Sequence, residues 1–149
     1  MKNLKLFDRK DKKRFLEILK KQFGFEDKLD YNFFINTKNK VFIVNKEIAE
    51  IDLSKIRINS LGSYIAEYRH DEVRLTIEGS QIIGEKAKKN ILELNDPEIK
   101  EWLSGKDIDK QTDLKGFVII KNKEDFIGSG KVSNNRILNY VPKIRRINV

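Results

Sequence analysis

The stretch that decides the fold is Gly116-Phe117-Val118-Ile119-Ile120, followed after a charged break by Phe126-Ile127-Gly128-Ser129-Gly130-Lys131-Val132. Aromatic and β-branched residues dominate both runs, and such residues favour extended strands. Two further runs of this kind follow, Arg136–Leu138 and Lys143–Ile147. The sequence therefore predicts that the C-terminal part is nearly all strand. Glycines inside a strand pattern, as at 128 and 130, indicate a bulge or a close approach of backbone.

The residues just upstream predict a short strand at Ile91–Leu94 and then a helix ending at Leu103. Asp96 is the expected N-cap, and Pro97 would occupy the first helical position, where its missing N–H is harmless. Ile99, Trp102 and Leu103 would form the apolar face, and Gly105 would end the helix.

Further outward, the N-terminal half predicts a mixed unit. A helix is expected over Arg9–Phe23, capped by Asp8 and stopped by Gly24, with apolar residues recurring every three or four positions. Its other face is basic, so it either packs its apolar stripe on a sheet or lies on a membrane or nucleic acid; we favour packing. Strands are predicted at 31–35, 41–44, 55–59, 64–68 and 73–77, a helical turn at 46–51, and a second helix at 78–88.

These patterns predict an α+β protein in which an N-terminal α/β domain at 1–88 precedes a small β domain at 89–149. The 149 residues contain no cysteine, which excludes disulfides, zinc ribbons and a thiolate nucleophile. The single histidine, His70, excludes a multi-histidine metal centre. The N-terminus does not resemble a signal peptide, and no apolar run is long enough to span a bilayer. We therefore expect a cytoplasmic protein with no membrane partner.

The net charge of +8 is unevenly spread along the chain. Residues 1–24 carry a net +6 and residues 25–128 a net −3, whereas residues 129–149 carry +5 and no acidic residue. Clustered lysine and arginine attract phosphates, so the distribution favours a polyanionic partner. For the N-terminal block we favour another explanation, a general preference for surface lysine, because lysines outnumber arginines 23 to 8.

Catalytic patterns are weak. The run Gly128-Ser129-Gly130-Lys131 lacks the spacing of a phosphate-binding loop. His70 stands beside Asp71 and Glu72 in an expected hairpin turn, where a histidine is usually solvated. A small hydrolase built around His70 is therefore only a minor alternative.

Four motifs resemble a known module when taken in order: Leu103–Ile108, Lys115–Ile120, Ile127–Lys131 and Asn139–Arg146. Together they resemble a PUA-type RNA-binding domain, in particular the C-terminal PUA-like module of the Sun/Nop-type RNA cytosine-5 methyltransferases. Residues 58–67 are similar to the segment that precedes this module in stand-alone archaeal relatives associated with ribosome biogenesis. A similar arrangement is found in the Nip-type ribosome-biogenesis factors.

The resemblance implies a PUA-like β pseudo-barrel in the second domain. The methyltransferases of this family react through a cysteine and bind S-adenosylmethionine on a separate domain. This chain has neither a cysteine nor the glycine-rich loop of such a domain. The implied function is a non-catalytic RNA-binding protein, without a cofactor, that recognises rRNA or tRNA in RNA modification or ribosome biogenesis. The alternative is a protein–protein adaptor for an RNA methyltransferase or a pre-ribosomal particle.

Carried onto this chain, the resemblance places the RNA-binding surface on the end of the 96–104 helix and on the C-terminal strand. Lys143 and Arg145 would face RNA phosphates, whereas Arg146 would point to the other side of the strand. For Asn139, Tyr140 and Gly105 a structural role is the open alternative to contact with a nucleotide. The expected RNA-binding residues are Lys143, Arg145, Arg146, Lys131, Arg136, Asn139, Tyr140, Gly105 and Lys106.

Overall fold

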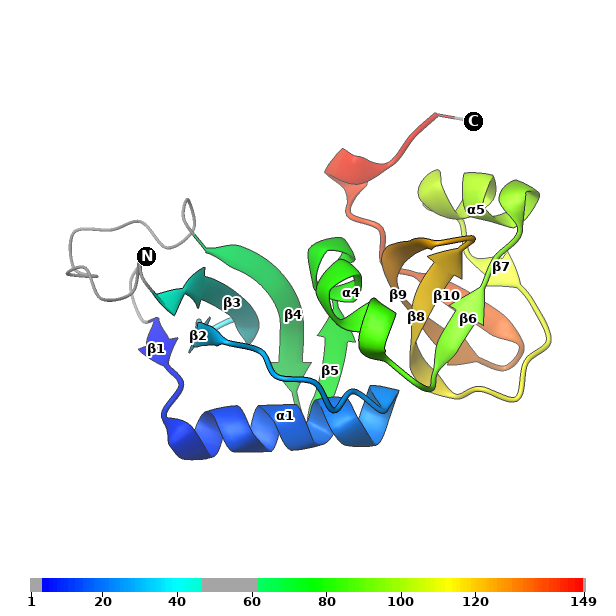
Figure 1. Cartoon of the computed structure of the whole chain (residues 1–149). Helices are drawn as coiled ribbons and strands as arrows, with labels where there is room; N and C mark the ends of the chain where they lie inside the picture. Colours follow the sequence, from blue (N-terminus) through cyan, green and yellow to red (C-terminus); the bar gives the residue numbers. More distant parts are fainter. Residues whose placement is uncertain (1–3, 47–61, 149) are drawn as a thin grey trace.

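The computed structural model describes residues 4–46 and 62–148. Its strands form two five-stranded sheets, which we call sheet A and sheet B. Sheet A has the order β1-β2-β3-β4-β5 and sheet B the order β6-β8-β9-β10-β7. Figure 1 shows sheet A above the long helix α1, sheet B in the other half of the molecule, and helix α4 between them. The predicted α+β class is confirmed.

Sheet A is an antiparallel meander of consecutive strands. Its strands are β1 (Lys5–Leu6), β2 (Tyr31–Ile35), β3 (Lys40–Asn45), β4 (Ser63–Arg69) and β5 (Glu72–Leu75). Each strand pairs with its neighbour in sequence. Short turns at 36–39 and 70–71 join β2 to β3 and β4 to β5, whereas the long helix α1 lies between β1 and β2. Because side chains alternate along a strand, one face can be apolar, and this face receives α1.

Helix α1 (Arg9–Phe23) follows the predicted bounds because both its caps are local. The Asp8 carboxylate accepts from the Asp11 backbone N–H, and the Asp11 side chain accepts from the Asp8 N–H in return. Gly24 ends the helix in the left-handed conformation, with φ +65°. Its apolar stripe is buried against sheet A, which confirms the packing prediction: Phe15, Ile18, Leu19 and Phe23.

Helix α4 (Ile77–Ile83) and the 3₁₀ turn η2 (Gly84–Lys86) join the two sheets. The predicted strand 73–77 ends at Leu75, because the Thr76 hydroxyl caps α4 by accepting from the Gly79 N–H. The expected helix to residue 88 is correspondingly shorter. The Ser80 hydroxyl donates to the Ile77 carbonyl and accepts from the Gly128 N–H of sheet B, at 2.8 Å, so α4 is bonded to the second half.

Sheet B is the curled sheet of the C-terminal half. Strand β6 (Ile91–Glu93) pairs in parallel with β8 (Gly116–Asn122), and all other pairings are antiparallel. The remaining strands are β9 (Asp125–Ser133), β10 (Arg136–Asn139) and β7 (Ile108–Asp109). With helix α5 (Asp96–Leu103) they enclose a separate core around the fully buried Trp102. The predicted small β pseudo-barrel is confirmed.

Gly128 lies at the irregularity that the glycine pattern predicted. Between Ile119 and Lys121 the pairing of β8 with β9 slips, because two β8 steps oppose three β9 steps. Gly128 has φ +78°, a conformation that other residues rarely adopt. The resulting bulge lies against the first residue of α4, where an added Cβ would come within 3.2 Å of Ile77 Cγ1.

Two further local predictions were wrong. Lys143–Ile147 is not a strand: residues Lys143–Arg145 form the 3₁₀ turn η3 after Pro142, which cannot donate a ladder hydrogen bond. Asn95, rather than Asp96, caps α5, because its amide oxygen accepts from the Glu98 N–H. The two-residue strands β1 and β7 were not predicted. The helical turn expected at 46–51 lies outside the described residues except for Lys46, as does the strand expected at 55–59.

Candidate nucleic-acid interface

A groove of about 620 Å³ lies between sheet A and the C-terminal segment. Residues of β4, β5 and the start of α4 line one side, and residues of β9 and of segment 139–146 line the other. Figure 1 shows the C-terminal segment running beside α4, and Arg145 pairs with Glu78 of that helix at 2.8 Å. The groove therefore combines residues from both halves of the sequence.

A row of two aromatic rings flanked by two cations begins in this groove, at Arg74 and Tyr140, and continues beside it. We call it the cation–aromatic strip, and it consists of Lys131, Phe117, Tyr140 and Arg74. The Lys131 ammonium lies 5.1 Å from the centre of the Phe117 ring, which meets the Tyr140 ring edge-on at 5.6 Å. The Arg74 guanidinium lies 4.8 Å from the Tyr140 ring centre. These spacings are within the range of cation–π attraction.

The strip is partly open to solvent. Tyr140 is among the few large apolar or aromatic side chains of the described residues that are exposed, at 36%. Phe117 and Lys131 are half-buried, and Arg74 is held by the Glu67 carboxylate at 2.6 Å. Rings exposed beside cations are the combination that proteins use to stack bases and neutralise phosphates together.

Turn η3 places two of the predicted cations at the opening of the groove. Lys143 and Arg145 both line it, and among residues 4–46 and 62–148 no acidic group pairs with Lys143. Arg145 donates to Glu78, but both side chains remain more than 40% exposed, so the pair is well solvated. Ile144, between them, is 94% exposed.

Arg146 turns back onto the protein. Its Nε donates to the Val141 carbonyl at 3.0 Å, and its side chain lies over Gly105. A Cβ at Gly105 would approach Arg146 Cδ and Nε to 2.6 Å, and Gly105 itself has φ +98°. The Ile147 N–H donates to the Leu103 carbonyl, which fixes the segment on the end of α5. Gly105 thus has a structural role in receiving Arg146.

Asn139 binds its own chain with all its side-chain polar atoms. Its amide nitrogen donates to the carbonyls of Trp102 and Lys106, and its amide oxygen accepts from the Val141 N–H. These bonds join the end of α5 to the C-terminal segment. Of the two roles considered for Asn139, the structure shows the structural one.

The remaining two predicted residues do not line the groove. Arg136 begins β10 and pairs with Asp109 of the neighbouring strand at 3.0 Å. Lys106 is exposed in the loop after α5, with its carbonyl bonded to Asn139. The structure therefore gathers Lys143, Arg145, Arg146, Asn139 and Tyr140 at the groove and Lys131 beside it, and leaves Arg136 and Lys106 apart.

Sequence reasoning missed the residues that the N-terminal half contributes. Arg74, Tyr64 and Lys40 line the groove, with the Lys40 ammonium 5.3 Å from the Tyr64 ring centre. The alternation of apolar and polar residues along β5 was the available signal. Because Val73 and Leu75 are buried, the Arg74 side chain between them faces away from the core. Such alternation tells on which face of the strand a side chain lies, but it does not tell which distant segment of the chain that side chain contacts.

The cations on the basic face of α1 have different neighbours from those of the cation–aromatic strip. Arg14 makes a two-point contact with Asp71, and Lys5 and Lys20 pair with Asp11 and Glu26. Lys12 donates to the Tyr31 carbonyl and lies over the Phe33 ring, and burial is the main reason why its pKa is lowered. The aromatic rings beneath these cations belong to the buried core.

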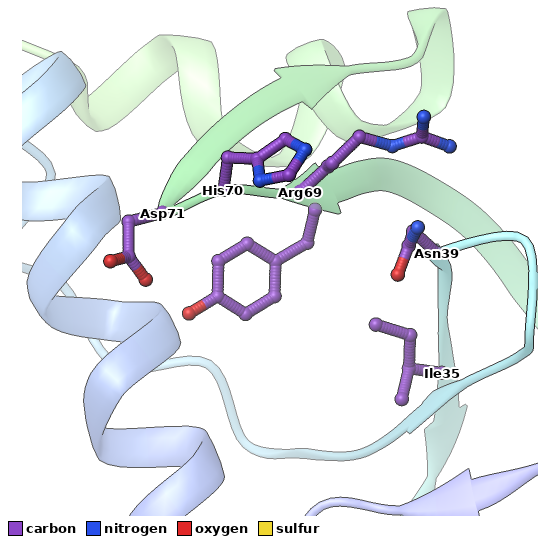
Figure 2. A pocket seen from close by; sticks show the side chains of 6 residues that line it. Ile35, Asn39, Arg69, His70 and Asp71 are labelled. Carbon is purple, nitrogen blue, oxygen red and sulfur yellow. The ribbon is translucent and has the colours of Figure 1, made fainter.

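His70 lies in the β4–β5 turn beside a shallow pocket of about 520 Å³. Figure 2 shows the Asp71 carboxylate directed toward α1 and the His70 ring pointing elsewhere. Arg14 engages both oxygens of that carboxylate, and hydrogen bonding to it is the main reason why the pKa of Arg14 is raised. The pair is thus not arranged as a base and its orienting acid.

The described residues show neither a metal-binding cluster nor a membrane-spanning helix. Residues 4–46 and 62–148 contain no group of three or more histidine, cysteine, aspartate or glutamate side chains able to hold a metal ion. Within the same ranges, no helix has the length and apolarity to cross a membrane.

Residues 89–147 match the family described as the methyltransferase RsmF PUA domain. Residues 89–147 form a PUA-like domain. The match begins just before β6 and ends after η3, so it contains sheet B, α5 and most of the C-terminal segment. The resemblance to the PUA-like module of the Sun/Nop-type enzymes is therefore confirmed.

Relatives of the PUA-like domain are bacterial rRNA methyltransferases. Ribosomal RNA small subunit methyltransferase F of Vibrio campbellii is 31% identical over 97 residues, covering 61% of this chain and 20% of the relative. The enzymes of the same name from Aeromonas salmonicida and Vibrio cholerae are each 29% identical, over 90 and 98 residues. They cover 60% and 65% of this chain and 19% and 21% of the relatives.

Two facts follow from these alignments. The chain spans about a fifth of the length of the curated relatives it matches. Only 61 residues follow Lys88, so alignments of 90 residues or more also extend upstream of the PUA-like domain. The similarity therefore includes residues upstream of the PUA-like domain. These relatives are bacterial, whereas the resemblance at residues 58–67 pointed to archaeal proteins.

Proposed function

We propose that this protein is a non-catalytic RNA-binding protein of rRNA modification, and that its RNA surface is the cation–aromatic strip together with turn η3. The observation that carries the proposal is the continuous row of Lys131, Phe117, Tyr140 and Arg74, ending beside Lys143 and Arg145. All of these residues except Arg74 lie on a domain similar to one found in rRNA methyltransferases. The proposed domains are 1–88 and 89–149, and the proposed location is the cytoplasm.

Each part of this surface has a chemical use. Lys143 and Arg145 would neutralise backbone phosphates, and their charge would give an affinity that falls as salt rises. Tyr140 and Phe117 would stack on bases, which is tolerant of sequence because every base has an aromatic face. Lys131 and Arg74 keep their rings in place and add positive charge beside them.

Salt dependence of RNA binding tests the proposal. The affinity of the intact protein for a structured rRNA fragment should fall linearly on a log–log plot against salt concentration. Replacing both cations of the turn, by Lys143→Ala with Arg145→Ala, should reduce the slope by about 1.4–1.8, since each lost phosphate contact removes about 0.7–0.9. The matched control is Lys10→Ala with Lys13→Ala, which removes the same charge from the exposed face of α1.

The control distinguishes direct contacts between η3 and the RNA from a general effect of the protein's net charge. Equal effects of the two double variants would mean that net charge alone drives binding, and would contradict the proposed surface. An unchanged slope in the turn variant would contradict it as well. If the intact protein does not bind RNA, the proposed function is wrong.

One observation favours a second candidate, a protein–protein adaptor. Ile144 is almost fully exposed at the tip of η3, and Ile147 is 46% exposed nearby. Exposed apolar side chains at one place are typical of protein contact sites. If the protein is an adaptor, an RNA methyltransferase or a pre-ribosomal particle should be recovered with it from cells. This partner should stay bound after RNase treatment, and an Ile144→Ser variant should fail to bind it.

A further inference from the structure

The inner end of the groove contains a buried hydroxyl without a partner. Ser129 of β9 lines the groove and is 3% exposed. Within the described part of the chain, its Oγ makes no hydrogen bond. A hydroxyl removed from water normally gains a partner, because leaving it unpaired costs free energy. A ligand that brings a donor or acceptor to this point would supply one.

Strand pairing tells which way Ser129 faces. It stands directly opposite Ile119 of β8, so the two side chains share one face of sheet B. Ile119 is buried in the same apolar cluster as the residues of sheet A and α1. Ser129 is therefore on the side of sheet B that faces the N-terminal half. The hydroxyl of Ser80, which contacts the adjacent residue Gly128, accepts from the Gly128 N–H and donates to the Ile77 carbonyl.

Two aromatic rings line the groove, and each has a cation over it. The Arg74 guanidinium lies 4.8 Å from the centre of the Tyr140 ring, and the Lys40 ammonium lies 5.3 Å from the centre of the Tyr64 ring. Burial raises the pKa of Tyr64, so its phenol keeps its proton and remains able to donate. The groove thus presents flat apolar faces and polar hydrogen-bonding groups together, which suits a heterocyclic base.

The charges at the groove suit the rest of a nucleotide. Five cations line it and two acids accompany them, each acid bonded to one of the cations: Glu67 to Arg74 and Glu78 to Arg145. Arg146 donates its Nε–H to the Val141 carbonyl. Lys40 and Lys143 are left to bind a phosphate. The volume of about 620 Å³ is in the range of roughly 300–1,000 Å³ that small-molecule sites occupy.

We propose that the groove between sheet A and the C-terminal segment takes one unpaired nucleotide of the bound RNA, with its base at Tyr140 and Ser129. A base within a duplex cannot enter, because its faces are stacked and its edge is paired. This inference rests on the proposed RNA-binding function and adds to it a preference for an unpaired position. It also gives the N-terminal half a part in recognition, through Tyr64, Arg74 and Lys40.

The test compares two RNA hairpins with the same stem, one blunt and one carrying a single-stranded extension. The full-length protein should bind the extended hairpin more tightly. Ser129→Val removes the hydroxyl and should reduce that preference by up to about tenfold, the value of one hydrogen bond. Tyr140→Leu removes the stacking ring from a partly exposed position and should reduce it by roughly tenfold or more. The matched control is Ser133→Val, at the exposed end of the same strand, which should keep the preference.

The outcomes are separable. Equal binding of both hairpins by the intact protein would overturn this inference while leaving RNA binding in place. If the Ser129 and Tyr140 variants both keep the full preference for the extended hairpin, the inference is overturned as well. If the Ser129 variant fails to fold, as judged by its thermal unfolding, the Tyr140 variant decides. Absence of binding to either hairpin would overturn the proposed function together with the inference.

Discussion

Helix α1 and the C-terminal segment are the two basic regions of this protein, and they hold their aromatic rings in opposite ways. Under α1 the rings of Phe15 and Phe33 are buried, at 0% and 1% exposure, and the cations lie above them among acids of the same surface. At the C-terminal segment, Tyr140 is exposed and the chain after Asp125 contains no acid.

The difference teaches that positive charge alone does not identify an RNA surface. In α1 the aromatic residues stabilise the fold, and the lysines keep the outer face solvated. In the strip the rings and the cations are open to the same partner, so a base and its phosphate can be bound together. The two regions carry similar net charge, +6 over residues 1–24 and +5 over residues 129–149, which makes them a natural internal comparison.

The largest expected effect is on the stability of the α1 region. Phe15 is fully buried and its ring meets those of Phe7, Phe33 and Tyr68 at 5.3–5.9 Å. Phe15→Ala should lower the free energy of unfolding by about 3–5 kcal/mol, measured by urea denaturation. At temperatures where the variant is folded, its RNA affinity should match that of the intact protein. A folded variant with weakened RNA binding would show that α1 takes part in recognition.

A middle-sized effect is expected at Gly105, where sequence analysis left a nucleotide contact open. Gly105→Ala places a Cβ against the Arg146 side chain in a backbone conformation that alanine disfavours. We expect a loss of stability of about 1–3 kcal/mol and a displaced C-terminal segment. RNA affinity should fall because η3 moves. Normal stability with reduced RNA affinity would instead indicate that Gly105 contacts the nucleotide directly.

The smallest effect is expected where an acid accompanies the C-terminal cations. Glu78→Gln removes the carboxylate that Arg145 contacts at 2.8 Å, in a pair that is nearly half exposed. Such pairs contribute about 0.2–1 kcal/mol, so freeing Arg145 should raise RNA affinity by up to about fivefold. The matched change, Asp71→Asn at the Arg14 pair of α1, should leave RNA affinity unchanged. A fall in affinity for Glu78→Gln would mean that the pair orients Arg145 for binding.

Local signals determined how much of this molecule could be predicted. The bounds of α1 follow from Asp8 and Gly24, which act within one turn of the chain, and the bulge follows from Gly128. The predicted strand at 143–147 failed because the side chains of Ile144 and Ile147 are exposed and have no core to pack against. Pro142 also cannot extend the ladder.

The candidate site depends on contacts that no local pattern contains. Arg74 and Tyr140 are 66 positions apart, and they meet only because α4 holds the two sheets together. Ser129 is one polar residue in a strand, and its missing partner is visible only when its neighbours are placed. The charge pattern therefore pointed to cations of the C-terminal segment that line the groove, whereas the residues from sheet A required the structure.

The most direct test of the central claim is an NMR titration of the isotopically labelled protein with a structured RNA that carries a single-stranded extension. We predict that backbone shifts change at Phe117, Lys131, Tyr140 and Lys143–Arg145, and at Arg74 across the groove. Positions along the exposed face of α1, such as Lys10 and Lys13, should not change. Changes confined to α1, with none along the strip, would contradict the account.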